Sequence, residues 1–157
     1  MKTVVLFASI TLASGLMLTN IYNSIVDARS WGFDIPQSIE TARQYFKSVN
    51  PGNFFRVFSP INQVLALIAL ILFWKWSPSI RIYLAVALLL YILADVFTFA
   101  YFYPRNNIMF STARLNDIDT LKRAWQGWSI MNWLRSAMLF VGLVFSFLAL
   151  HKIYTTK

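Results

Sequence analysis

The chain alternates between long apolar segments and shorter stretches that carry most of its charged residues. Apolar residues run almost without interruption over residues 3–27, 81–103 and 129–154, and over a shorter segment at 60–76. A helix needs about 20 such residues to cross the hydrocarbon core of a bilayer. Because the runs are continuous rather than alternating, they argue against lipid-facing β-strands. We therefore predict four transmembrane helices, the second of which reaches full length only if residues 54–58 continue it.

Two long connections, residues 28–60 and 104–128, would lie at one face of the membrane, with the short turn 77–80 and both termini at the other. Each long connection has apolar residues at intervals of three and four, which predicts an amphipathic helix on the bilayer surface or capping the bundle. We expect the first of these helices to stop at Asn50-Pro51-Gly52. The apolar positions are Ile35, Ile39, Ala42, Phe46 and Val49 in the first connection, and Leu115, Ile118, Leu121, Trp125 and Trp128 in the second. The predicted fold is an all-α, four-transmembrane-helix bundle with amphipathic helices in its two long loops, forming one integral membrane domain over residues 1–157.

The first apolar segment has a second interpretation. Lys2 followed by a short apolar run and small residues resembles a signal peptide. The apolar run continues through residues 16–22, however. We therefore expect a first transmembrane helix that is not cleaved.

Composition supports the bilayer as the main partner of the chain. Hydrophobic residues make up 58% of it and charged residues only 13%, whereas a soluble domain carries about 25% charged residues. The net charge of +8 comes from basic residues scattered singly through apolar sequence, so we do not expect nucleic-acid binding. The sequence has no cysteine and one histidine, so we expect no disulfide framework, no conventional zinc site and no metal cofactor.

The distribution of Lys and Arg bears on orientation in two opposing ways. The long loops hold eight basic residues, so a raw count places these loops in the cytoplasm. The basic residues on the side of the termini lie next to helix ends and have no acidic residue among them. On that ground we expect a protein of the cytoplasmic membrane, of the bacterial inner-membrane kind, with both termini in the cytoplasm. The basic residues on this side are Lys2, Lys75, Arg81, Lys152 and Lys157.

Two ionisable residues lie inside the predicted spans at matching depth. Asp95 precedes the end of the third span at Tyr103 by eight residues, about 12 Å along a helix. Arg135 follows Trp128 by seven residues, about 10 Å below the same face. Because charges in the hydrocarbon are costly, this pair needs an explanation. It forms either a structural ion pair between the third and fourth helices or part of a polar pocket at the mouth of the bundle.

Further polar and aromatic residues belong to the same half of the membrane. Asn20, Asn62 and Asn132 lie inside the spans near the face of the long loops, while the other half is almost purely apolar. Tyr91 and Trp133 offer aromatic surface on which a planar ligand could stack, with lipid or core contacts as the alternative. Trp128 is a further aromatic candidate at the start of the last helix. The sequence has no phosphate-binding glycine loop, metal-ligand cluster or dinucleotide fingerprint, and no repeated halves typical of a transporter.

Two stretches resemble a known family. The stretch WQGWSIMNWLR, residues 125–135, resembles the W-x-x-W-…-R start of the last helix in the anthrone-oxygenase-like family of small four-helix membrane proteins. Pro104-Arg105-Asn106-Asn107 resembles the P-x-N-N turn that follows the third helix of that family. The arrangement of a long first loop, a tight central turn and a long third loop also agrees with the family.

The resemblance implies cofactor-free oxidation of a hydrophobic aromatic molecule, as in fungal enzymes that convert an anthrone to an anthraquinone without metal or flavin. A phenolic carbon acid would be deprotonated and its anion would react with O₂. Asp95 would be the base, and Arg135, Asn132, Asn106 and Asn62 would bind the developing oxyanion. Asn132 stands where the family often has His, and an Asp95 paired to Arg135 would be a weak base.

The alternative is a non-catalytic membrane protein, either a binder of a lipid or quinone-like ligand or a subunit of a larger membrane complex. The sequence is also compatible with an oligomer. An open cavity that reaches Asp95 and Arg135 would favour a ligand site, whereas an enclosed ion pair would favour a scaffold.

Overall fold

The computed structural model describes residues 2–111 and 117–155, and these residues form helices and no strand. Four helical segments are long and apolar enough to cross a membrane: Lys2–Gly32, Pro51–Phe73, Pro78–Phe110 and Ile118–Thr155. The prediction of an all-α protein with four membrane-spanning helices is confirmed. Such lengths and apolar composition are those of an integral membrane protein.

The first span comprises α1 (Lys2–Tyr22), a π-helical segment η1 (Asn23–Asp27) and α2 (Ala28–Gly32). It is followed by α3 (Gln37–Tyr45) and by the second span, α4 (Pro51–Phe73). The third span begins with α5 (Pro78–Phe97) and continues without interruption through η2 (Thr98–Phe102), α6 (Tyr103–Asn106) and η3 (Asn107–Ser111). The last helix, α7 (Ile118–Thr155), is 38 residues long.

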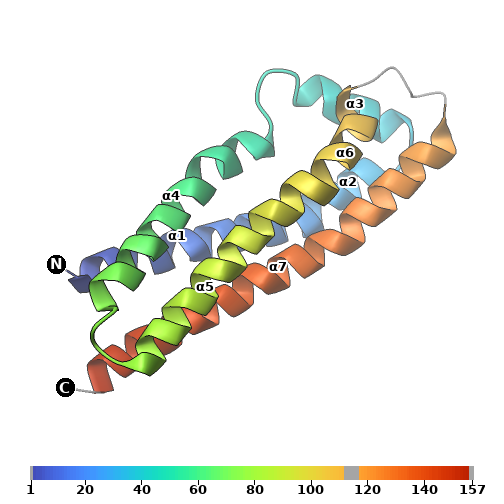
Figure 1. The fold of residues 1–157 in the computed structure, drawn as a ribbon. Helices are drawn as coiled ribbons and strands as arrows, with labels where there is room; N and C mark the ends of the chain where they lie inside the picture. The colour runs from blue at the N-terminus through green and yellow to red at the C-terminus, as the bar shows by residue number, and fades with distance from the viewer. Residues whose placement is uncertain (1, 112–116, 156–157) are drawn as a thin grey trace.

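The four long helices pack side by side, so that α1 contacts α4 and α7, and α5 contacts the same two helices. Figure 1 shows both termini at the same end of the bundle as the turn between α4 and α5, which we call the turn end. At the opposite end, the loop end, α3 and the connection to α4 lie across the bundle (Figure 1). The long loops thus gather at one end, as the sequence predicts.

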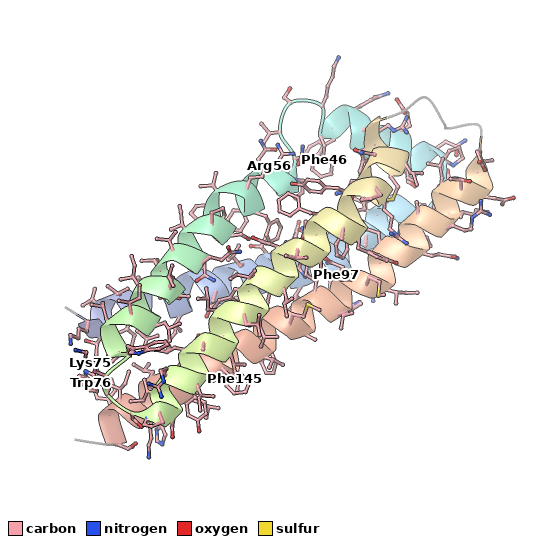
Figure 2. All side chains as sticks on the ribbon, in the orientation of Figure 1. Phe46, Arg56, Lys75, Trp76, Phe97 and Phe145 are labelled. Atoms are coloured by element: carbon pink, nitrogen blue, oxygen red, sulfur yellow. The ribbon has the colours of Figure 1, made fainter. Side chains whose placement is uncertain are left out.

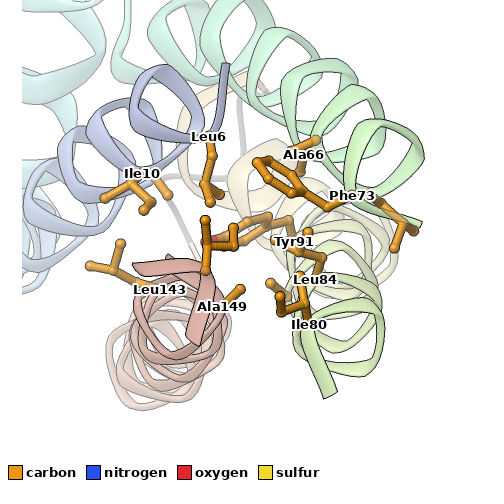
Figure 3. Close-up of a cluster of buried hydrophobic side chains, with 14 of the residues drawn as sticks. Leu6, Ile10, Ala66, Phe73, Ile80, Leu84, Tyr91, Leu143 and Ala149 are labelled. Atoms are coloured by element: carbon orange, nitrogen blue, oxygen red, sulfur yellow. The ribbon is translucent and has the colours of Figure 1, made fainter. Parts of the chain in front are cut away.

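Two clusters of buried apolar side chains hold the bundle together. The turn-end cluster includes Leu6, Ala66, Phe73, Leu84 and Ala149, contributed by all four long helices (Figure 3). In the loop-end cluster, Ile39 and Ala42 of α3 pack with side chains of the first, third and fourth spans. Because Ile39 is completely buried, α3 caps the bundle rather than lying apart from it.

The second span begins nine residues before the predicted boundary at residue 60. The side chain of Asn50 accepts a hydrogen bond from the backbone N–H of Gly52, and the side chain of Asn53 accepts one from the backbone N–H of Asn50, which completes a capping box. Pro51 occupies the first turn, where its missing N–H costs nothing. The Asn-Pro-Gly triplet therefore starts α4 instead of ending α3, which stops at Tyr45.

At two places where the sequence predicts an interruption of the helix, the structure shows continuous helix. Residues 118–128 are helical as predicted, but they form the first three turns of α7 rather than a separate surface helix, because no helix-breaking residue separates them from the span. Leu115 lies outside the described residues. Pro104-Arg105-Asn106-Asn107 was predicted to form a turn, whereas Tyr103–Asn106 is helical with Pro104 in its first turn.

Candidate functional site

A cavity of about 830 Å³ lies at the loop end of the bundle. Its walls come from α4, from the continuous third span, from α7 and from Asn23 and Trp31 of the first span, and α3 with the following loop contributes Arg43, Phe46, Lys47 and Asn50. Ligand sites for drug-sized molecules have volumes of about 300–1,000 Å³. The cavity is therefore large enough for a multi-ring organic ligand.

Arg135 of α7 lines this cavity and is only 5% exposed. Its guanidinium carbon lies 4.4 Å from the ring centroid of Phe55 on α4 and 5.7 Å from that of Phe102. The Nε atom is buried without a hydrogen-bond partner, and the side chain makes neither a hydrogen bond nor an ion pair with any of the described residues. A buried charge held only by aromatic faces retains most of its capacity to bind an anion.

Asp95 of α5 lines the same cavity, and its carboxylate is held by a neutral donor from α4. Nε2 of Gln63 donates to Oδ2 of Asp95 at 2.7 Å. Of the two alternatives that the sequence leaves open for Asp95 and Arg135, the structure does not show the contact ion pair, and both residues line the cavity. Among the described residues the ion pair present is between Arg43 and Glu40. Asp95 and Arg135 interact electrostatically without contact, because Gln63 engages the carboxylate while the guanidinium stacks on Phe55.

Two further predicted site residues, Trp128 and Asn106, also line the cavity. The Trp128 ring packs edge-on against Trp31 and Phe102, with centroid distances of 5.0 and 5.5 Å. Its Nε1 atom is buried and has no hydrogen-bond partner among the described residues. Trp128 and Arg135 therefore both bring unsatisfied N–H donors to this region of the bundle.

The predicted contacts Asn20 and Asn132 lie outside the lining of the cavity. Each Nδ2 donates to the backbone carbonyl of the other asparagine, at 3.2 Å from Asn20 and 3.0 Å from Asn132. Nδ2 of Asn20 also donates to the hydroxyl of Ser136, and Nδ2 of Asn132 donates to that of Ser24, both at 2.7 Å. These donors are used in joining α1 to α7 and are unavailable to a ligand.

Asn62, Tyr91 and Trp133 are likewise not part of the lining. Asn62 is buried and its Oδ1 accepts a hydrogen bond from Ser9 of α1 at 3.2 Å. The hydroxyls of Tyr91 and Ser146 lie 3.0 Å apart, and the Tyr91 ring belongs to the turn-end cluster (Figure 3). Trp133 is exposed on the outer face of α7.

The structure adds polar residues that the sequence analysis did not select, above all Gln63. Consecutive residues of an α-helix point about 100° apart. Asn62 therefore faces α1, whereas Gln63 faces the cavity and Asp95. The other polar residues that line the cavity and were not selected are Asn23, Arg43, Lys47, Asn50, Arg56, Thr98, Tyr103 and Asn107.

Charge in the lining is predominantly positive. Arg43, Lys47, Arg56 and Arg135 face a single carboxylate, that of Asp95, among the described residues of the lining. Figure 2 places Arg56 and Phe46 at the loop end, beside the connection between α3 and α4. Nε of Arg43 donates to the carbonyl of Met109 at 2.6 Å and so ties α3 to η3. The described residues contain no group of three side chains suited to hold a metal ion.

Three π-helical segments of the described chain contribute to the walls of the cavity: Asn23 from η1, Phe102 from η2 and Phe110 from η3. In η2 the N–H of Tyr103 donates to the carbonyl of Thr98, five residues earlier. The next residue, Pro104, has no N–H to continue an α-helical ladder. Such local widening re-aims side chains and is frequent at functional sites.

Comparison with known proteins connects this site to a family. Residues 53–145 match a family model described as anthrone oxygenase. The matched region runs from the first turn of α4 into α7 and includes both Asp95 and Arg135. Neither the curated proteins nor the solved structures gave a match to the chain.

Proposed function

The chain belongs to the anthrone oxygenase family, and on this premise we propose that it binds a hydrophobic phenolic aromatic molecule in the loop-end cavity and oxidises it with O₂. The observation that carries the proposal is the Arg135 guanidinium, which lines the cavity and has no polar partner among the described residues. A buried positive charge of this kind is satisfied when an oxyanion of a ligand enters.

In the proposed reaction, the Asp95 carboxylate removes a proton from the methylene carbon of an anthrone-type substrate. The electron pair of the broken C–H bond delocalises onto the carbonyl oxygen, and Arg135 and the Nε1–H of Trp128 stabilise this oxyanion. The carbanion carbon then transfers electrons to O₂ and forms a C–O bond, and the resulting peroxide anion takes back the proton from Asp95 to give a C–OOH group. Loss of water from this group gives the second ketone, so that a CH₂ and one O₂ become a C=O and one H₂O.

The position of Asp95 supports its role as the base. Its carboxylate accepts a hydrogen bond from the neutral amide of Gln63 and is not neutralised by contact with Arg135. The positive charges of the lining also favour the anionic intermediate over the neutral substrate. Binding energy is thus directed to the species in which charge develops.

The proposal is tested with purified protein in lipid nanodiscs and 1,8-dihydroxyanthrone as the probe. We expect O₂ uptake above the rate in empty nanodiscs for the wild type and for Arg123→Ala, an exposed arginine of the same helix. Arg135→Ala should lose both this uptake and any aromatic ligand that co-purifies in native mass spectrometry. Equal uptake by Arg135→Ala and wild type would contradict the proposal.

A second candidate is a non-catalytic binder of the same class of ligand. It is favoured by the asparagine at position 132, where the family often has a histidine that could act as a base. Binding of the probe under anaerobic conditions, without O₂ uptake in air, would support this candidate against the oxygenase.

We also propose that both termini lie in the cytoplasm. Lys2, Lys75, Arg81 and Lys152 lie at the turn end next to the ends of the four spans, where basic residues favour the cytoplasmic side. Of two reporters fused in turn to the C-terminus, only the one that functions in the cytoplasm should be active. Activity of the reporter that requires export would contradict the proposed orientation.

A further inference from the structure

The cavity reaches the outer surface of the bundle between α4 and α5. Ile92, Val96 and Phe99 lie on one stripe of the third span, and each lines the cavity while being 40, 54 and 62% exposed, respectively. Pro60 of α4 is exposed and belongs to the lining as well. We call these four residues the lateral window.

The lateral window lies within the part of the protein that the bilayer covers. The third span runs from Pro78 to Phe110, so its midpoint is near residue 94, between Ile92 and Val96. The side chains of the window are apolar, as the hydrocarbon core requires. An opening at this depth communicates with lipid rather than with water.

The rest of the cavity has the opposite character. Arg43 and Lys47 line it from α3 and the following connection, and Asp95 and Arg135 line it from α5 and α7. The cavity is thus polar towards the loop end and apolar at its side. This division matches a molecule with a polar aromatic head and an apolar tail. The volume of about 830 Å³ is also at the upper end of the range for compact ligands.

We propose that the ligand is such an amphiphile: its phenolic or quinol head lies at Asp95 and Arg135, and its isoprenoid or alkyl tail passes through the lateral window into the bilayer. This inference rests on the proposed function, since it uses the same head site. A tail in the window is shielded by lipid on its outer side and by Val96 and Phe99 on its inner side. The ligand would reach the cavity from the membrane, where such molecules concentrate.

The test compares two probes, 1,8-dihydroxyanthrone and its 3-decyl derivative, by anaerobic titration into protein in nanodiscs. Val96→Trp should obstruct the window and weaken binding of the decyl probe about tenfold or more, a loss of about 1.4 kcal/mol, while binding of the tail-less probe changes little. Leu93→Trp is the matched control, because Leu93 is 41% exposed on the same helix but does not line the cavity.

The outcomes separate this inference from the proposed function. If Val96→Trp weakens both probes equally, or neither, the tail does not occupy the window and the inference is overturned while the head site stands. If the wild type binds neither probe, the proposed function fails and the inference fails with it. If Val96→Trp does not fold, the test uses Phe99→Trp instead, because this substitution obstructs the same window one turn further along the helix.

Discussion

Asn20 and Asn132 form a reciprocal pair in which the side-chain amide of each donates to the backbone carbonyl of the other. The pair joins α1 to α7 about one helical turn before Arg135, which lies three residues after Asn132 in α7. Each amide makes a second hydrogen bond, to a serine of the opposite helix. This network positions the helix that carries Arg135 and Trp128, although neither asparagine lines the cavity.

Asn20→Ala and Asn132→Ala should each destabilise the protein, by about 1–2 kcal/mol for interhelical hydrogen bonds in a membrane protein. Because each amide donates to the backbone carbonyl of the other residue, which alanine retains, a single variant keeps the hydrogen bonds of the remaining amide. The double variant should therefore lose about the sum of the two single losses. The measurement is unfolding in detergent with increasing SDS, with the exposed Gln126→Ala as a control. A double variant that loses much less than this sum would contradict the independence of the two amides.

Arg135→Met should abolish ligand binding without destabilising the fold. Methionine keeps most of the apolar contact with Phe55, and it removes a buried charge that has no hydrogen-bond partner among the described residues. Replacing such a charge by an apolar side chain is often neutral, or stabilising by about 1–4 kcal/mol. The unfolding midpoint and the anaerobic affinity for 1,8-dihydroxyanthrone measure the two effects. A large loss of stability would instead assign Arg135 a structural role.

Asp95→Asn should separate binding from catalysis. The amide has the shape of the carboxylate, and its oxygen can still accept the hydrogen bond from Gln63, so probe affinity should stay within a few-fold. Loss of a general base typically costs about 10²- to 10⁴-fold in rate. O₂ uptake with the anthrone probe measures the rate. Unchanged uptake would remove Asp95 from the proposed reaction.

Gly142→Ala should loosen the packing between α5 and α7. A Cβ atom at this position would lie 2.7 Å from Cε1 of Tyr91, whose ring is enclosed by the turn-end cluster. Overpacking of this kind costs about 1–3 kcal/mol.

Gly15→Ala is the matched control, because a Cβ there meets none of the described residues within 4 Å. Alanine is a better helix former than glycine by about 1 kcal/mol, so this variant should be as stable as the wild type or more so. Equal thermal shifts for Gly15→Ala and Gly142→Ala would show that the Tyr91 ring moves aside at little cost.

The sequence alone determined the four spans, their short central turn, the collection of the long loops at one end and the family. These features depend on apolar run length, on helical periodicity and on short motifs, all of which are local properties of the chain. Asp95 and Arg135 were also found from the sequence, because a charge inside an apolar span stands out wherever the helices pack.

Only the tertiary structure decided which polar residues share the cavity. Asn62 and Gln63 are neighbours in the chain, but the rotation between successive helix residues points one at α1 and the other at Asp95. The same packing engaged Asn20 and Asn132 with each other and placed Tyr91 in the apolar core. It also kept Asp95 and Arg135 from forming a contact ion pair, because Gln63 on α4 donates to the carboxylate and the guanidinium stacks on Phe55 of the same helix. The depth of a side chain in the membrane follows from its position in the sequence, whereas its partners follow from the faces that neighbouring helices present.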